Sequence, residues 1–221
     1  MTWNLPTLLT ALRLAAALVM PLAFLILPRP YADWFALILF VAASATDWID
    51  GYLARAWGQV TRLGAMLDPI ADKAMVAVAL LVLAAFSSLT MLLLVPAALI
   101  LFREVFVSGL REYLGDTAGT LKVTSLAKWK TMVQMVAISV LFAHGIFEHA
   151  FGMSVWGMDN ALINEILQGR ISDEMGLKFK LAGMEWTGWG GIALIWLAAA
   201  LTVITGYDYF RKAQPHLKES R

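Results

Sequence analysis

Four aspartates in the first third of the chain have the type and spacing of a catalytic metal site. Asp47 and Asp50 are three residues apart, and Asp68 and Asp72 are four apart. On a helix, each pair would project from one face, with side chains about 5 to 6 Å apart. Their flanks are apolar, and one carboxylate at the middle of a membrane helix costs roughly 2.5 to 3.5 kcal/mol on insertion scales. Four carboxylates together therefore need a compensating charge.

Two divalent cations would balance the aspartates, because such ions prefer oxygen ligands and match four carboxylates in charge. The nearby basic residues Arg55, Arg62 and Lys73 are too few to neutralise the cluster alone. A structural alternative is helix capping with ion pairs at the membrane interface. Asp68 before Pro69 fits an N-cap followed by proline at the first helical position. Capping accounts for Asp68 but not for the other three aspartates.

The composition around this cluster is that of a membrane protein. The chain has 221 residues, of which 60% are hydrophobic and 15% charged, against roughly half and a quarter in soluble domains. A net charge of +1 gives no basic face for nucleic acid. Cysteine is absent, which excludes disulfides, thiolate nucleophiles and sulfur-ligated metals.

We expect an all-α, polytopic fold with six transmembrane helices. Apolar runs predict spans at 8–28, 34–57, 131–147 and 186–210. The uncharged stretch 74–102 is too long for one crossing of a hydrocarbon core of roughly 30 Å. The polar interruption at 87–90 divides it into two spans, with the second aspartate pair at the start of the first of these.

An even number of spans places both termini on one side, and the basic residues favour the cytoplasm for that side. Arg55, Arg62, Arg111, Lys122, Lys128, Lys130, Arg211, Lys212, Lys218 and Arg221 would be cytoplasmic; Arg29, Arg170, Lys178 and Lys180 would be outside. The active site would then face the cytoplasm. No repeat or linker is visible, so residues 1–221 should form one membrane domain. We expect an extracytoplasmic loop at about 148–185, with a short amphipathic helix at 160–168.

The string Asp47-Trp-Ile-Asp50-Gly51-Tyr-Leu-Ala54-Arg55, followed by Gly64, Asp68 and Asp72, resembles the signature of CDP-alcohol phosphotransferases at every fixed position. The segments 4–13, 103–112 and 128–131 are similar to those of bacterial phosphatidylglycerophosphate synthases. The resemblance covers nearly the whole chain. The segment 148–185 departs from it by being longer than expected.

This resemblance implies transfer of the phosphatidyl group of CDP-diacylglycerol to sn-glycerol 3-phosphate, with release of CMP. It implies two divalent cations, Mg²⁺ or Mn²⁺, on Asp47, Asp50, Asp68 and Asp72, with Asp72 also the general base. It further implies a homodimer among the lipids of the bacterial inner membrane.

Substrate contacts can be assigned to two groups of residues. We expect CDP-lipid binding by Gly51, Ala54, Arg55, Thr10 and Arg13. Helix packing and snorkelling are the alternatives for the small and basic members. We expect the phosphate of the acceptor alcohol to be bound by Arg103, Arg111, Lys128 and Lys130, with arginine giving forked contacts. Topology anchoring is the alternative, above all for the lysines.

Two other functions remain open from the sequence. The same fold could transfer to serine, inositol phosphate or phosphatidylglycerol, although the resemblance of the segment 103–111 to phosphatidylglycerophosphate synthases favours glycerol 3-phosphate. Intramembrane carboxylates could instead serve divalent-cation transport. Transport would leave Gly51, Ala54 and Arg55 without a role.

Overall fold

The computed structural model describes residues 4–56, 61–120 and 125–217, and for 47–56 it describes the backbone alone. Every regular element in these ranges is helical, which confirms the predicted all-α fold. The elements are α1 (Leu5–Ile26), α2 (Tyr31–Ala56), α3 (Arg62–Phe86), α4 (Thr90–Leu114), the 3₁₀ helix η1 (Gly115–Thr120), α5 (Ser125–Val155), α6 (Asn160–Leu167) and α7 (Leu177–Leu217).

Five of these helices, α1, α3, α4, α5 and α7, are long and apolar enough to cross a membrane. The part of α2 from Tyr31 to Thr46 is a shorter apolar helix. The break predicted at 87–90 is confirmed, because α3 ends at Phe86 and α4 begins at Thr90. One crossing takes about 20 residues, whereas α5 has 31 and α7 has 41. Both therefore extend well beyond the length that a crossing needs.

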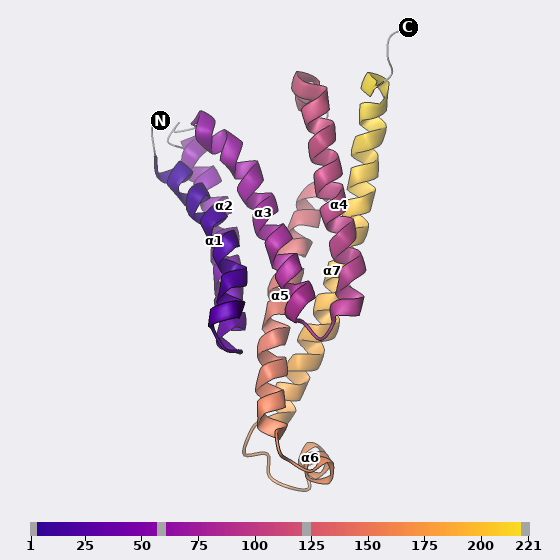
Figure 1. The fold of residues 1–221 in the computed structure, drawn as a ribbon. Helices are drawn as coiled ribbons and strands as arrows, with labels where there is room; N and C mark the ends of the chain where they lie inside the picture. Colours follow the sequence, from indigo (N-terminus) through magenta and orange to yellow (C-terminus); the bar gives the residue numbers. More distant parts are fainter. Residues whose placement is uncertain (1–3, 57–60, 121–124, 218–221) are drawn as a thin grey trace.

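The long helices form two groups that diverge towards the end of the molecule where α1 begins and α7 ends (Figure 1). Helices α1, α2 and α3 pack together, and so do α4, α5 and α7 in the pairs α5·α7 and α4·α7. Helix α5 joins the groups by packing against α2 and α3. The buried core lies at this junction, where the rings of Phe40 on α2 and Phe142 on α5 are 6.2 Å apart.

Helix α3 begins six residues before Asp68, so the predicted N-cap at Asp68 is wrong. The N-cap is Thr61, whose Oγ1 accepts a hydrogen bond from the Gly64 backbone N–H at 3.0 Å. Asp68 and Pro69 lie inside the helix. Gly64 lies in the first turn of α3. A Cβ there would lie 3.2 Å from Thr7 Oγ1 on α1, so the missing side chain allows α1 and α3 to approach closely.

Arg29 ties the helices together at the opposite end. Its Nε and Nη2 donate to the Asp33 carboxylate, each at 2.7 Å, and its Nη1 donates to the Phe86 carbonyl oxygen at 3.0 Å. The hydrogen bond to Asp33 raises the pKa of the Arg29 guanidinium. Gly145 on α5 packs on this pair, since a Cβ there would lie 2.5 Å from Asp33 Oδ1. This contact fixes α5 against α2 and the turn before it.

The segment 148–185 is less irregular than the sequence indicated. Helix α5 continues to Val155 and α7 already begins at Leu177, while the short helix predicted at 160–168 is confirmed as α6. Close packing explains the longer helices: a Cβ at Gly183 would lie 2.5 Å from the Phe147 ring, and that ring contacts Phe179 edge-on at 5.8 Å. The loop itself is confined to residues 156–176.

Candidate active site

The two α3 aspartates each contact a polar side chain of α1. Thr10 Oγ1 donates a hydrogen bond to Asp68 Oδ1 at 2.6 Å. Arg13 Nη1 lies 2.9 Å from Asp72 Oδ1, in an ion pair that joins residues 59 positions apart. Thr10 and Arg13 are buried, whereas the Asp72 side chain is 44% exposed. Residues that the sequence linked to the lipid substrate therefore hold the carboxylates in place.

A polar network at the start of α1 positions this contact. Asn4 caps α1 by accepting hydrogen bonds from the backbone N–H of Thr7 at 3.1 Å and from its hydroxyl at 2.6 Å. The Thr7 hydroxyl lies 2.8 Å from that of Thr61, the N-cap of α3. Two helix starts that are distant in sequence are thus joined through their caps. Their first turns are thereby aligned, which places Thr10 and Arg13 opposite Asp68 and Asp72.

The α2 part of the signature is only partly described. Asp47, Asp50, Gly51, Ala54 and Arg55 lie on helical backbone within α2, which agrees with a shared face for the two aspartates. Their side chains lie outside the described residues. Their assignment to metal and nucleotide therefore stays a prediction.

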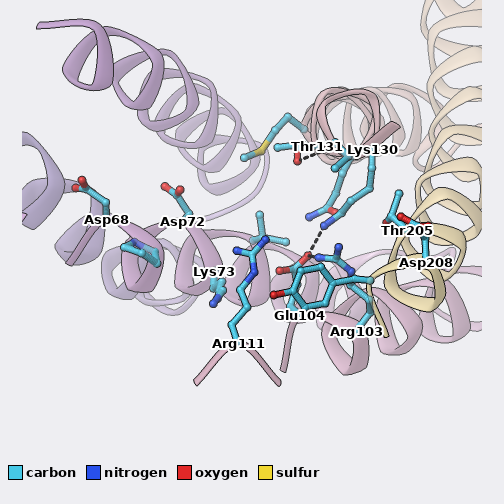
Figure 2. Close-up of a pocket in the computed structure, with 16 residues that line it drawn as sticks. Asp68, Asp72, Lys73, Arg103, Glu104, Arg111, Lys130, Thr131, Thr205 and Asp208 are labelled. Atoms are coloured by element: carbon cyan, nitrogen blue, oxygen red, sulfur yellow. Dashed lines mark hydrogen bonds and ion pairs between the residues drawn. The ribbon is translucent and has the colours of Figure 1, made fainter. Parts of the chain in front are cut away.

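A pocket of about 440 Å³ opens between α3, α4, α5 and α7. Figure 2 shows Asp68 and Asp72 on one side of it and a group of basic residues on the other. Three of the four residues predicted to bind the acceptor phosphate, Arg103, Arg111 and Lys130, line this pocket. Lys128 is exposed and is not among the lining residues. The complete lining is Asp68, Pro69, Asp72, Lys73, Val76, Arg103, Glu104, Arg111, Ala127, Lys130, Thr131, Gln134, Met135, Thr205, Asp208 and Tyr209.

Glu104 organises the basic side of the pocket. Its carboxylate pairs with the ammonium of Lys130, whose side chain is only 7% exposed. Arg103 Nη1 lies 3.2 Å from the same carboxylate oxygen. Arg111 lies over the Tyr209 ring, with its guanidinium carbon 5.3 Å from the ring centroid. We call Arg103, Arg111 and Lys130 the cationic cluster.

Sequence reasoning missed several residues that line the pocket. Glu104 stood beside Arg103 in the recognised segment but received no role. Lys73 crosses from α3 to α4, where its Nζ donates to Ser108 Oγ at 2.5 Å. Asp208 and Tyr209 on α7 complete the wall. A charged residue inside an apolar span indicates function, and this signal could have identified Asp208.

The described carboxylates could supply some of the oxygen ligands that a hard divalent cation needs. Mg²⁺ takes oxygen ligands and commonly uses only one or two carboxylates together with waters and substrate phosphates. Asp68 and Asp72, one turn apart on α3, offer such oxygens next to the pocket. Among the described residues no three His, Asp or Glu lie together as a metal-binding group. Asp47 and Asp50 on α2 stay predicted as further ligands.

The protein belongs to the CDP-alcohol phosphatidyltransferase family, whose sequence model matches residues 3–164. Among its relatives, a CDP-diacylglycerol–glycerol-3-phosphate 3-phosphatidyltransferase of Cereibacter sphaeroides is 52% identical over 221 residues, which is 100% of both chains. A Rickettsia bellii protein of the same name is 38% identical over 96% of this chain and 97% of its own. A Pectobacterium atrosepticum protein of that name is 44% identical over 64% of this chain and 78% of its own.

Proposed function

We propose that the protein transfers the phosphatidyl group of CDP-diacylglycerol to sn-glycerol 3-phosphate, giving phosphatidylglycerophosphate and CMP. The observation that carries the proposal is the pocket with an α3 carboxylate pair on one wall and the cationic cluster on the others. Such a pocket suits a reaction that brings a nucleotide diphosphate next to a second, phosphate-bearing substrate. Relatives that match this chain over nearly its full length carry the name of this activity.

Asp72 is the proposed general base. Its side chain is partly exposed and lines the pocket, and Arg13 fixes its orientation. In the reaction, Asp72 takes the proton of the acceptor hydroxyl as that oxygen bonds to the phosphorus of the phosphatidyl group. The bond from this phosphorus to the CMP oxygen breaks, and CMP leaves. Direct attack agrees with the absence of cysteine.

Asp47, Asp50, Asp68 and Asp72 would hold two divalent cations, Mg²⁺ or Mn²⁺. When bound, such ions neutralise the diphosphate and stabilise the charge on the leaving phosphate. Thr10 would orient Asp68 through its 2.6 Å hydrogen bond. Arg13 would do the same for Asp72 and add positive charge next to the diphosphate. Gly51, Ala54 and Arg55 would contact the nucleotide.

The cationic cluster would bind the phosphate of sn-glycerol 3-phosphate. Arg103 and Arg111 offer forked donors that match phosphate oxygens, and buried Lys130 adds a point charge. Glu104 would keep Arg103 and Lys130 apart from each other and facing the pocket. Lys128, exposed on the helix that carries Lys130, stays a prediction for this role.

We further propose six spans, with α2 as the sixth, in one domain within the bacterial inner membrane. The pocket is lined by residues near the start of α3 and α5 and near the end of α4 and α7, and Figure 1 shows the start of α3 and the ends of α4 and α7 on the same side of the molecule. Basic flanking residues favour the cytoplasm for that side. A homodimer is the proposed assembly.

The test is an acceptor panel with the purified full chain. CDP-diacylglycerol, Mg²⁺ and one alcohol at a time would be supplied: glycerol 3-phosphate, serine, inositol phosphate or phosphatidylglycerol. We expect CMP release and lipid product with glycerol 3-phosphate alone, loss of both with EDTA, and recovery with Mg²⁺ or Mn²⁺. Preference for another alcohol would overturn the acceptor, and absence of CMP release with all of them would overturn the reaction.

A further inference from the structure

We infer that Gly206 on α7 is a positioning residue for the reaction, because the space left by its missing side chain seats Arg103 in the pocket. The inference rests on the proposed function, in which Arg103 binds the phosphate of the acceptor alcohol. It concerns a part of the chain beyond residues 3–164, the segment that the family model matches. Part of the acceptor site would thus be built by α7.

The contact between Gly206 and Arg103 is unusually close. A Cβ at Gly206 would lie 2.8 Å from Arg103 Cγ, 3.5 Å from its Nε and 3.7 Å from its Cδ. Real Cβ atoms essentially never approach another heavy atom within 3.0 Å. Cγ is near the root of the arginine side chain, so moving the guanidinium alone would not relieve the clash. Either Arg103 must change its rotamer or α4 and α7 must separate.

The present rotamer gives Arg103 its place in the pocket. Its side chain is 15% exposed, and Nη1 lies 3.2 Å from Glu104 Oε1. Figure 2 shows Arg103 beside Glu104, and Asp208 of α7 lines the same pocket. Another rotamer would swing the guanidinium away from Glu104. The cationic cluster would then lose one of its two forked donors.

Other glycines of α7 supply matched controls. A Cβ at Gly190 would meet nothing within 4 Å. A Cβ at Gly191 would lie 2.7 Å from Leu141 Cδ2, and Leu141 belongs to the buried core and not to the pocket. Gly191→Ala therefore reproduces the crowding without involving the site, and Gly190→Ala reproduces the substitution without the crowding.

The experiment measures KM for each substrate and the melting temperature of the full-length variants. For Gly206→Ala we expect KM for glycerol 3-phosphate to rise about 10- to 100-fold, the cost typical of a small misplacement. KM for CDP-diacylglycerol should stay within about twofold of wild type, because α7 packs against α4, α5 and α6, whereas the residues proposed to contact the CDP-lipid lie on α1 and α2. Gly191→Ala should lower the melting temperature without raising KM for glycerol 3-phosphate relative to KM for CDP-diacylglycerol. Gly190→Ala should change neither the melting temperature nor the two KM values.

A double variant keeps the inference testable if Gly206→Ala folds poorly. Arg103→Ala removes the Cγ atom that the new methyl would strike, so Gly206→Ala should lower the melting temperature in the wild-type background but not in the Arg103→Ala background. The loss caused by Gly191→Ala should persist in both backgrounds. Equal losses from Gly206→Ala in both backgrounds, or an unchanged KM for glycerol 3-phosphate, would overturn the inference alone. A wild type that does not use glycerol 3-phosphate would overturn the proposed function, and the inference with it.

Discussion

Replacing Glu104 by glutamine should destabilise the protein, because it removes the carboxylate that lies between two basic side chains. The Lys130 side chain is 7% exposed and Arg103 is 15% exposed. Glutamine keeps the shape and one acceptor oxygen but removes the negative charge. The Lys130 ammonium would then be buried beside Arg103 without its counter-charge.

The size of the effect follows from the burial of the pair. Removing one partner of a buried ion pair costs about 3 to 5 kcal/mol. Glu104 is itself 19% exposed, so we expect the lower limit, about 3 kcal/mol. For a chain of this length each kcal/mol shifts the melting temperature by about 2 to 4 °C. The expected loss is therefore about 6 to 12 °C.

Tryptophan fluorescence during heating of the detergent-solubilised protein would measure this loss. Glu112→Gln is the matched control, because Glu112 is exposed on the same helix; its melting temperature should stay within about 2 °C of wild type. If Glu104→Gln melted like the control, Glu104 would not stabilise the cationic cluster, and the electrostatic account of the pocket would be refuted.

Three further predictions concern contacts between elements. Arg13→Ala should lower activity at least about 100-fold, because it removes the ion pair that orients the proposed base Asp72. Arg13→Lys should restore part of the activity. CMP release measures both variants, and an alanine variant as active as wild type would contradict the role of Arg13 in positioning Asp72. Gly145→Ala should cost about 1 to 3 kcal/mol of stability, since its Cβ would strike the Arg29–Asp33 pair. Gly152→Ala, with open space around its Cβ, should not destabilise the protein. Equal melting temperatures for the two variants would contradict the predicted clash at Gly145. Backbone hydrogen bonds from Lys178 and Leu177 lower the pKa of the Asp173 carboxyl. The stability that this carboxylate gives the folded protein is therefore present above the ordinary Asp pKa of about 3.9, and it is lost as the pH falls through the lower folded-state pKa. The difference in melting temperature between wild type and Asp173→Ala should therefore vanish at acidic pH, and a difference independent of pH would argue against this assignment.

The helices were predictable where hydropathy alone determines them. The uncharged stretch 74–102 was too long for one crossing, and the break at 87–90 lies between α3 and α4 as expected. The ends of α5 and α7 were not predictable in this way. Their extra turns depend on contacts such as Gly183 with the Phe147 ring, which join residues far apart in the chain.

The site shows the same division between local pattern and tertiary contact. The spacing of Asp68 and Asp72 and the basic character of the segment 103–111 identified two walls of the pocket from the sequence. The partners of these residues could not be inferred, because Arg13 reaches Asp72 across 59 positions and Lys130 reaches Glu104 across 26. Such pairs depend on which helix faces pack together, and a single sequence carries no local signal for that.

The most direct test of the central claim is CMP release from CDP-diacylglycerol with glycerol 3-phosphate, comparing wild type, Asp72→Asn and the exposed control Asp159→Asn. We predict that wild type and Asp159→Asn form phosphatidylglycerophosphate at similar rates. Asp72→Asn should be slower by at least about 100-fold, while its fluorescence melting curve still shows a cooperative folded state. A folded Asp72→Asn variant with more than half of the wild-type rate would contradict the assignment of Asp72 as the base, and a wild type that releases no CMP would contradict the reaction itself.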